Sequence, residues 1–174
     1  MENTNTDICK INRSMQDNLF VQYFSSPIGF LEIQATEIGL RAANFVDTPV
    51  MKENKNEMTN LVTQQLSEYF TGRRTEFDIS FDFEGTSFQQ IVWQTLCTIP
   101  YGKTWSYMEL AKKLGDIKKV RAVGLANGQN KISILVPCHR VIGSDGTLVG
   151  YAAGLHRKKF LLELENPTKQ GVLF

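Results

Sequence analysis

The residues of this 174-residue chain that are best suited to chemistry are Cys138 and His139, which directly follow Pro137. An ordinary cysteine thiol has a pKa near ~8.5, and only its thiolate is a strong nucleophile. A base or a positive charge must therefore stand close by, and His139 and Arg140 supply one of each. The pattern favours nucleophilic chemistry on the thiol of Cys138.

Two other interpretations of the Cys-His pair stay open at this point. Free cysteines are often buried, so a structural cysteine beside a chance histidine is the more frequent cause of an isolated pair. Zinc would need further ligands, but His156, Cys9 and Cys97 show no ligand spacing, and we predict no metal site. The three cysteines are widely spaced and odd in number, which indicates free thiols in a reducing compartment.

The segment before the cysteine must position it. Residues 132–136 are apolar and rich in β-branched side chains, which predicts a short buried strand. Pro137 ends strand pairing, so Cys138 would lie where the strand opens. Adjacent strand residues point to opposite faces, and direct contact between Cys138 and His139 therefore needs a turn or a bridging water.

Two short helices precede this segment. Ser106 and Glu109 form a capping-box signature that begins the first helix, and Gly115 ends it. The second runs over residues 117–127 and ends at Gly128, so the pair has the pattern of a helix-turn-helix. The second helix combines small and basic residues: Ala122, Gly124, Ala126, Lys118, Lys119 and Arg121. Close approach to a phosphate-bearing surface and packing against the helix's own domain both explain this composition.

The charge distribution divides the chain. Residues 1–87 hold 7 Lys and Arg against 13 Asp and Glu, whereas residues 88–174 hold 12 against 5. The whole-chain net charge of +1 hides this asymmetry. A basic second half favours a polyanionic partner, although basic helix faces are also common in proteins that bind none.

The first half is predicted to be a scaffold. Short apolar or alternating runs at residues 19–24, 31–35 and 40–46 predict an antiparallel meander, and residues 61–70 place apolar side chains on one helical face. Residues 77–83 alternate strictly and predict another strand. Residues 84–86 form the expected domain joint, after which Ser87 and Gln90 predict the cap of a helix with an apolar stripe at Phe88, Ile91, Val92 and Leu96.

Residues 88–165 closely resemble the O6-alkylguanine-DNA alkyltransferases, also called methylated-DNA–protein-cysteine methyltransferases. The segments that carry the resemblance are PCHRV at 137–141, YGKT at 101–104 with Ser106-Tyr107, RAVG at 121–124, GYAAGL at 150–155, and Glu165. The first half resembles their N-terminal domain more loosely, through the SSPIG turn at 25–29 and its strand-then-helix order.

The resemblance implies a fold and a domain plan. The expected class is α/β of the α+β kind, with a ribonuclease H-like antiparallel sheet and helix followed by a mainly helical, winged-helix-like domain with a helix-turn-helix. We expect a loose leader at residues 1–17, a scaffold domain at 18–86, and a DNA-binding and alkyl-acceptor domain at 87–174. Residues 1–17 carry no signal-peptide pattern, so the expected location is cytoplasmic, or nuclear in a eukaryote.

The resemblance also implies a role for each catalytic residue. Cys138 would accept the alkyl group, His139 would take its proton through a water, and Glu165 would hold the histidine. Asn130 would tie the active-site turn to the helix pair. Tyr107 would hydrogen-bond the flipped base and help protonate the leaving guanine.

Further residues would form the base pocket and the DNA surface. The carbonyls of Cys138 and Val141 would read the guanine amino group, and Arg121 would fill the gap left by the base. The expected pocket residues are Tyr107, Cys138, Val141, Tyr151, Ala152, Ala153, Gly154 and Lys158. The expected DNA contacts are Arg121, Ala122, Gly124, Lys118, Lys119 and Arg140. Two departures from the family pattern are Lys131, where proline is usual, and Ala153, where glycine is usual.

The resemblance therefore predicts repair by direct damage reversal: one irreversible transfer of an alkyl group from O6-alkylguanine, and possibly O4-methylthymine, to Cys138. The partner would be double-stranded DNA bound through the minor groove by a monomer, with no cofactor, metal or membrane. A non-enzymatic alkyltransferase-like DNA binder, a cysteine hydrolase and a structural cysteine are the alternatives. Cys138 itself argues against the first, because those proteins carry another residue at this position.

Overall fold

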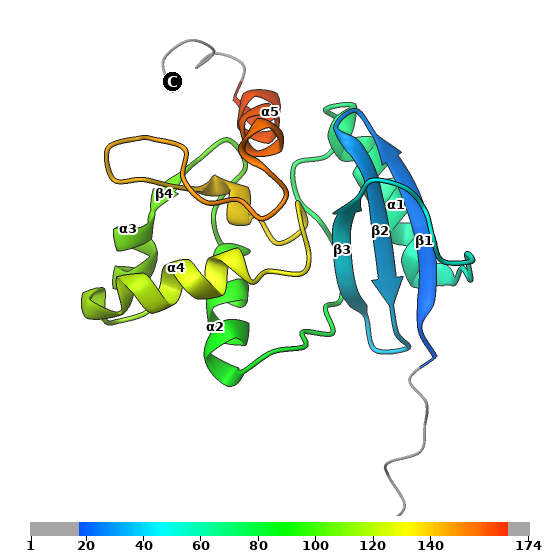
Figure 1. The fold of residues 1–174 in the computed structure, drawn as a ribbon, viewed down its shortest axis with the longest axis horizontal. Coiled ribbons are helices and arrows are strands. Elements are labelled where there is room, and N and C mark those ends of the chain that lie inside the picture. Colours follow the sequence, from blue (N-terminus) through cyan, green and yellow to red (C-terminus); the bar gives the residue numbers. More distant parts are fainter. Residues whose placement is uncertain (1–17, 167–174) are drawn as a thin grey trace, which may run out of the picture.

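The computed structural model of the chain describes residues 18–166. Figure 1 shows two parts side by side: a β-sheet with one helix, from residues 18–86, and a mainly helical part, from residues 87–166. We call them the N-terminal part and the C-terminal part. An antiparallel sheet followed by a helical region confirms the predicted fold class.

The sheet contains β1 (Phe20–Ser26), β2 (Gly29–Ala35) and β3 (Leu40–Val46), antiparallel in the order β1-β2-β3. A tight turn joins the first two strands, because Gly29 adopts a φ of 121° that side chains disfavour. The meander predicted from the alternating runs is therefore confirmed.

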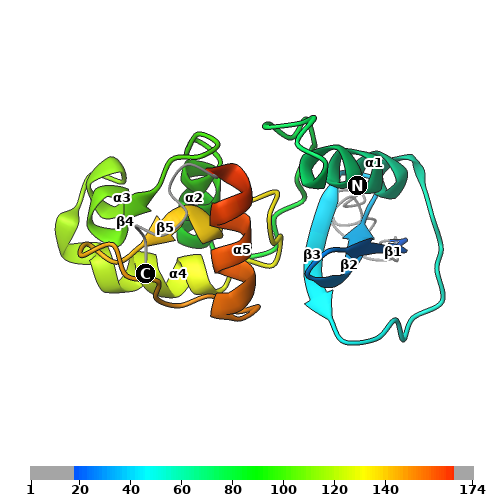
Figure 2. The same cartoon turned by 90° about the horizontal axis from the view of Figure 1, so that it is seen from above.

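One helix, α1 (Glu57–Phe70), covers a face of the sheet, as the view from above in Figure 2 shows. The helix begins where the side chain of Asn56 accepts a hydrogen bond from the Thr59 amide. Its buried face includes Val62, Leu66 and Tyr69, each fully enclosed. The apolar helical face predicted over residues 61–70 thus becomes the cover of the sheet.

Residues 77–83 do not form the strand that the sequence predicts. They pair with β3 at a single bridge, where the Leu40 amide donates to the Ser80 carbonyl (2.8 Å) and the Asp82 amide donates to the Leu40 carbonyl (2.9 Å). The ladder extends no further within the described chain. The alternating pattern reflects burial alone, since the apolar side chains at 77, 79, 81 and 83 pack against the core.

The C-terminal part consists of α2 (Ser87–Leu96), β4 (Trp105–Ser106), α3 (Tyr107–Lys113), α4 (Val120–Gly128), β5 (Val141–Ile142) and α5 (Leu155–Glu165). The short strands β4 and β5 pair in parallel. The predicted capping box of α3 is confirmed, because the Glu109 amide donates to Ser106 Oγ (3.1 Å) and the Ser106 amide donates to Glu109 Oε2 (2.6 Å). No helix among residues 18–166 has the length and apolar character needed to cross a bilayer.

The cap of α2 lies one residue earlier than predicted. Thr86 and Gln89 form the capping box, not Ser87 and Gln90. The buried face is correspondingly rotated: Ile91 is half exposed, whereas Trp93 is buried and donates its indole N–H to the Ala126 carbonyl (2.8 Å). This bond fastens α2 to α4.

Residues 132–136 are buried, as predicted, but form a turn and not a strand. The Val136 amide donates back to the Ile132 carbonyl (3.1 Å), and Ile134 adopts a φ of 72° that strands do not contain. The turn is anchored to β3, because the Ala43 amide donates to the Lys131 carbonyl (2.9 Å) and the Ser133 amide donates to the Ala43 carbonyl (2.8 Å). The segment before Cys138 therefore joins the two parts of the molecule.

Candidate active site

Cys138 begins a 3-10 turn, Cys138–Arg140, and is almost fully buried. The Asn130 amide nitrogen donates to Cys138 Sγ (3.1 Å) and to the Val136 carbonyl (3.0 Å). Asn130 Oδ1 in turn accepts from the Ile132 amide (2.9 Å). One side chain thus connects the end of α4, the turn and the sulfur, which is the geometry predicted for Asn130.

The thiol of Cys138 is neutral in this setting. Burial raises its pKa above the ordinary value, and the opposing effects of the Asn130 hydrogen bond and the nearby Lys158 charge are smaller. A buried neutral thiol is a weak nucleophile, so reaction at Sγ needs a group that removes the proton.

His139 is such a group. Its side chain is fully buried, and its Nε2 lies 2.8 Å from Glu165 Oε1. Burial lowers the pKa of His139, and the attraction of Glu165 does not fully offset this. An ionised carboxylate can only accept, so neutral His139 carries its proton on Nε2 and leaves Nδ1 as a base. Nδ1 has no hydrogen-bond partner among the described residues.

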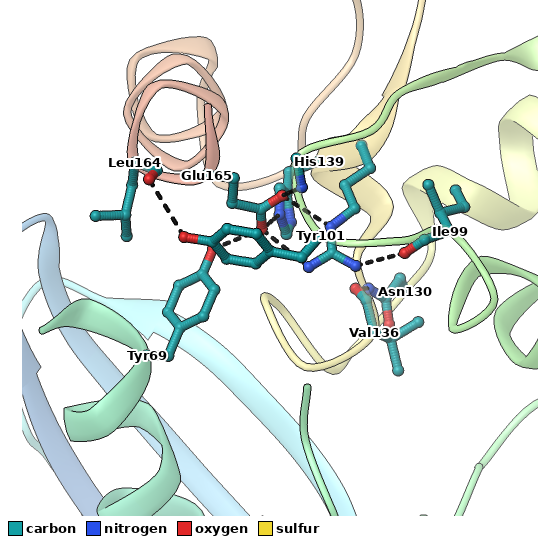
Figure 3. Close-up of polar contacts among 10 residues, drawn as sticks. Tyr69, Ile99, Tyr101, Asn130, Val136, His139, Leu164 and Glu165 are labelled. Carbon is teal, nitrogen blue, oxygen red and sulfur yellow. Dashed lines mark hydrogen bonds and ion pairs between the residues drawn. The ribbon is translucent and has the colours of Figure 1, made fainter. Parts of the chain in front are cut away.

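Glu165 lies at the centre of a buried network, drawn in Figure 3. Oε1 accepts from His139 and from the hydroxyl of Tyr69 (2.7 Å), while Oε2 accepts from Arg140 Nε (2.9 Å) and the Gly102 amide (3.3 Å). Burial alone would raise the pKa of Glu165, but its pairing with His139 and with the Arg140 guanidinium outweighs burial and holds the pKa well below its usual range. The carboxylate is therefore a permanent negative charge.

The prediction that Arg140 contacts DNA was wrong. Its guanidinium is buried and donates hydrogen bonds to Glu165 and to the Ile99 carbonyl (2.6 Å). A buried arginine that neutralises a buried carboxylate cannot reach a phosphate. Arg140 belongs to the inner network of the site.

A narrow cavity lies beside the sulfur. It is lined by Cys138, by three of the predicted pocket residues, Tyr151, Ala152 and Ala153, and by Asn127, Gly128, Asn130, Ser133 and Gly150. The cavity measures about 10 Å³, roughly the room that one water needs. The cavity in this form is therefore far too small for a purine ring.

Four predicted pocket residues do not line this cavity: Tyr107, Val141, Gly154 and Lys158. Gly154 is the N-cap of α5, with a φ of 95°. Lys158 is fully buried, and its ammonium donates to the carbonyls of Val141 (2.6 Å) and Val149 (2.7 Å). Burial lowers the pKa of Lys158 to about 8. The Val141 carbonyl, predicted to read the guanine amino group, here accepts from Lys158.

The helix pair presents the remaining predicted residues outward. Tyr107 donates its hydroxyl to the Val149 carbonyl (3.3 Å). An open depression of about 400 Å³ is lined by Tyr107, Val120, Arg121, Gly124, Val149 and Gly150. Ala122, Lys118 and Lys119 are exposed nearby, at the start of α4 and in the preceding 3-10 helix, Ile117–Lys119.

The described residues show no ready metal site. No group of three or more His, Cys, Asp or Glu side chains within residues 18–166 lies close enough together to hold a metal ion. Cys9, one of the candidates weighed from the sequence, lies outside the described residues. Cys97 is exposed and Cys138 is buried, and both are free thiols.

Two family models match almost the whole described chain. Residues 19–83 match the ribonuclease-like domain of 6-O-methylguanine DNA methyltransferase, and residues 87–167 match its DNA-binding domain. The chain belongs to the 6-O-methylguanine DNA methyltransferase family. The resemblance stated from the sequence motifs is confirmed.

Individual relatives agree with this assignment. A methylated-DNA–protein-cysteine methyltransferase of Methanosarcina acetivorans is 45% identical over 153 residues, which cover 84% of this chain and 98% of the relative. The crystal structure of Mycobacterium tuberculosis O6-methylguanine methyltransferase aligns with a TM-score of 0.78 at 43% identity, covering 86% of this chain and 93% of the other. M. tuberculosis OGT in complex with DNA aligns with a TM-score of 0.77 at 43% identity, covering 85% and 93%.

Two buried polar residues at the site of this family member were not predicted from the sequence. Asn127 lines the cavity beside Cys138, and its Oδ1 has no hydrogen-bond partner among the described residues. A polar residue on the inner face of a helix was the available signal. Tyr69 reaches Glu165 from a helix 96 residues away, and no local pattern indicates this contact.

Proposed function

We propose that this protein repairs DNA by taking the alkyl group of an O6-alkylguanine irreversibly onto Cys138 Sγ. The observation that carries the proposal is the pairing of a buried free thiol with His139, whose Nδ1 is unpartnered among the described residues and whose Nε2 contacts Glu165. Membership of the 6-O-methylguanine DNA methyltransferase family supports the choice of substrate.

The chemical step follows from the electrostatics. The thiol proton passes through a water to His139 Nδ1, and Glu165 stabilises the resulting imidazolium. The thiolate electron pair forms an S–C bond to the alkyl carbon, while the bond between that carbon and guanine O6 breaks and leaves its electrons on the guanine. Tyr107 assists by donating its hydroxyl proton to the departing base, which leaves as neutral guanine. The proton that His139 took from the thiol then returns through solvent to Tyr107, so the thiol proton is in effect transferred to the guanine. The thioether on Cys138 has no route back to a thiol, so each molecule reacts once.

The helix pair explains how the base arrives. The small residues Ala122 and Gly124 let α4 approach the minor groove, and Lys118 and Lys119 lie where they would meet phosphates. Arg121, exposed beside the depression at Tyr107, would fill the stack that the extruded guanine vacates. The cavity at Cys138 must open for this base, which requires Val149 and Gly150 to move from Tyr107 and Lys158.

Weighing the intact protein tests the proposal. We expect incubation with O6-methylguanine DNA to add the mass of one methyl-for-hydrogen exchange, located on Cys138. Cys138→Ala should abolish transfer and leave DNA binding near that of the unmodified protein, whereas Cys97→Ala should transfer normally. Repeated turnovers without a mass gain would favour a cysteine hydrolase, and transfer by Cys138→Ala would refute the mechanism.

We propose a domain boundary at residues 84–86, because Thr86 caps α2 there and the two family matches meet across this segment. Cys138 at the acceptor position disfavours a purely DNA-binding role. A monomeric state and a cytoplasmic location stay predictions.

A further inference from the structure

The N-terminal part reaches the candidate active site through Tyr69. This residue lies on the last turns of α1, is fully buried, and donates its hydroxyl to Glu165 Oε1 at 2.7 Å. Figure 3 shows its side chain pointing from α1 toward the carboxylate at the end of α5. The N-terminal part therefore supplies a hydrogen bond to the active-site network as well as the anchor for the turn before Cys138.

The oxygen that Tyr69 contacts is the one that also accepts from His139. Nε2 of His139 lies 2.8 Å from the same Oε1. Burial and the neighbouring Glu165 raise the pKa of Tyr69 far above its ordinary value, so its hydroxyl always donates. Arg140 Nη2 also donates to Oε1, at 3.0 Å. Donors that share one oxygen compete for its electron density, so loss of the Tyr69 hydrogen bond alters the remaining ones.

We propose that Tyr69 is a positioning residue for alkyl transfer, whose hydroxyl fixes the Glu165 carboxylate and moderates its pull on His139. The inference rests on the proposed function, in which neutral His139 is the base. The N-terminal part, predicted to be only a scaffold, would then affect the chemistry at Cys138 directly.

Tyr69 differs in origin from the other groups that surround the Glu165 carboxylate. Arg140 and His139 approach from the 3-10 turn, the Gly102 amide approaches from the turn before β4, and Lys158 on α5 adds charge near His139. Among the described residues, these donors and charges all belong to the C-terminal part. Tyr69 alone comes from the other part.

The position of the Tyr69 hydroxyl is fixed by aromatic packing. The ring packs edge-on against Phe70 and Tyr101, with centroids 5.4 and 6.1 Å away, and at a tilt against Phe77 at 5.4 Å. Tyr69→Phe keeps these contacts and removes one donor. Oε1 retains its bonds to His139 and Arg140, so the carboxylate is not left without partners.

Loss of the Tyr69 hydroxyl should shift the pH dependence of the transfer rate in one direction. Glu165 would attract the His139 proton more strongly, and the pKa of His139 would rise. Since only neutral His139 accepts the thiol proton, the acid limb of the rate profile should move to higher pH, by about half to one unit. The variant is then slowed most under acidic conditions and least under alkaline ones. A purely structural role would lower the rate equally at every pH.

Tyr101→Phe is the matched control. The Tyr101 hydroxyl also donates to α5, but to the backbone carbonyl of Leu164 (3.3 Å) and not to Glu165. Single-turnover methyl transfer from saturating O6-methylguanine DNA would be followed by intact mass across pH for the wild type and both variants. We expect the acid limb of the rate profile to move to higher pH in Tyr69→Phe and to keep its wild-type position in Tyr101→Phe. An acid limb at the same pH in all three proteins would overturn the proposal.

A second measurement separates this inference from the function it rests on. The chain has two histidines, and His156 is exposed, so NMR titration of the imidazole nitrogens follows His139 against an internal reference. If the wild type accepts no methyl group, the proposed function fails, but a raised His139 pKa in Tyr69→Phe still supports the positioning role and an unchanged one refutes it.

If Tyr69→Phe does not fold, NMR of the wild-type protein tests the proposal. A short bond to a buried carboxylate should give a slowly exchanging, downfield hydroxyl proton with a cross-relaxation peak to the Tyr69 ring. Its presence supports the proposal, and its absence overturns it.

Discussion

Arginine has opposite surroundings in two regions of the C-terminal part. Arg140 is buried and bonded through Nε and Nη2 to Glu165, beside the reactive thiol. Arg121 is exposed on α4, at the edge of an open depression and near the exposed Lys118 and Lys119. Both were predicted to contact DNA, but only Arg121 lies on an accessible surface.

The difference shows how the molecule separates binding from chemistry. The exposed cations face solvent, where their attraction to phosphate is long-ranged and screened by salt. The charges around Glu165 are enclosed by protein, which strengthens their interaction and fixes their protonation states. Damage recognition and proton transfer can therefore be perturbed one at a time.

The largest expected effect is on stability. Arg140→Met would leave the Glu165 carboxylate buried without its cation, which costs about 3–5 kcal/mol of unfolding free energy. Arg121→Met removes the same charge from an exposed site and should change stability by less than about 0.5 kcal/mol. Urea unfolding followed by circular dichroism measures both. Similar losses in the two variants would contradict the division into buried and exposed cations.

The secondary structure could be predicted from the sequence wherever a local pattern is typical of one kind of element. The three strands of the sheet and the cap at Ser106 were predicted correctly, because alternation and capping are local signals. Residues 77–83 and 132–136 were not, since burial produces the same apolar pattern in a strand and in an extended or turned segment. Ile134, at a φ of 72°, shows how far a β-branched residue can depart from its propensity when tertiary contacts require it.

The candidate site divides in the same way. Cys138, His139 and Glu165 were identified from sequence motifs, and the structure brings them together. Arg140 was misassigned, because a basic residue next to a reactive cysteine has the same sequence signature whether it points outward or inward. Tyr69 and its bond to Glu165 depend on the packing of α1 against α5, which only the fold determines.

The second expected effect is on the rate of repair in duplex DNA. Extrusion of a paired base costs a few kcal/mol, and Arg121 would offset part of that cost by filling the gap. Arg121→Ala should therefore slow transfer from duplex O6-methylguanine by about 10- to 100-fold at saturating DNA. Free O6-benzylguanine needs no extrusion and should react at nearly the wild-type rate.

Single-turnover rates on both substrates decide the role of Arg121. An equal defect on the free base would show that Arg121 affects the chemistry and not extrusion. A defect in DNA affinity alone, with a normal rate at saturation, would make Arg121 an ordinary phosphate contact.

The smallest expected effect concerns the charge asymmetry between the two halves, and a matched pair of lysines tests it. Lys119 lies before α4 and Lys55 lies before α1; both are about half exposed, and each has an acidic neighbour, Asp116 at 3.9 Å and Glu53 at 3.1 Å. If Lys119 neutralises a phosphate, Lys119→Ala should weaken DNA binding severalfold and reduce the slope of log affinity against log salt by about one. Lys55→Ala should change neither quantity, because the acidic N-terminal part is expected to lie away from the DNA.

Fluorescence anisotropy with labelled duplex at several salt concentrations measures both slopes. The transfer rate at saturating DNA should stay the same in both variants, since the site at Glu165 is enclosed. A loss of slope in Lys55→Ala equal to that in Lys119→Ala would place the DNA across both parts of the molecule and refute the assignment of binding to the helix pair alone.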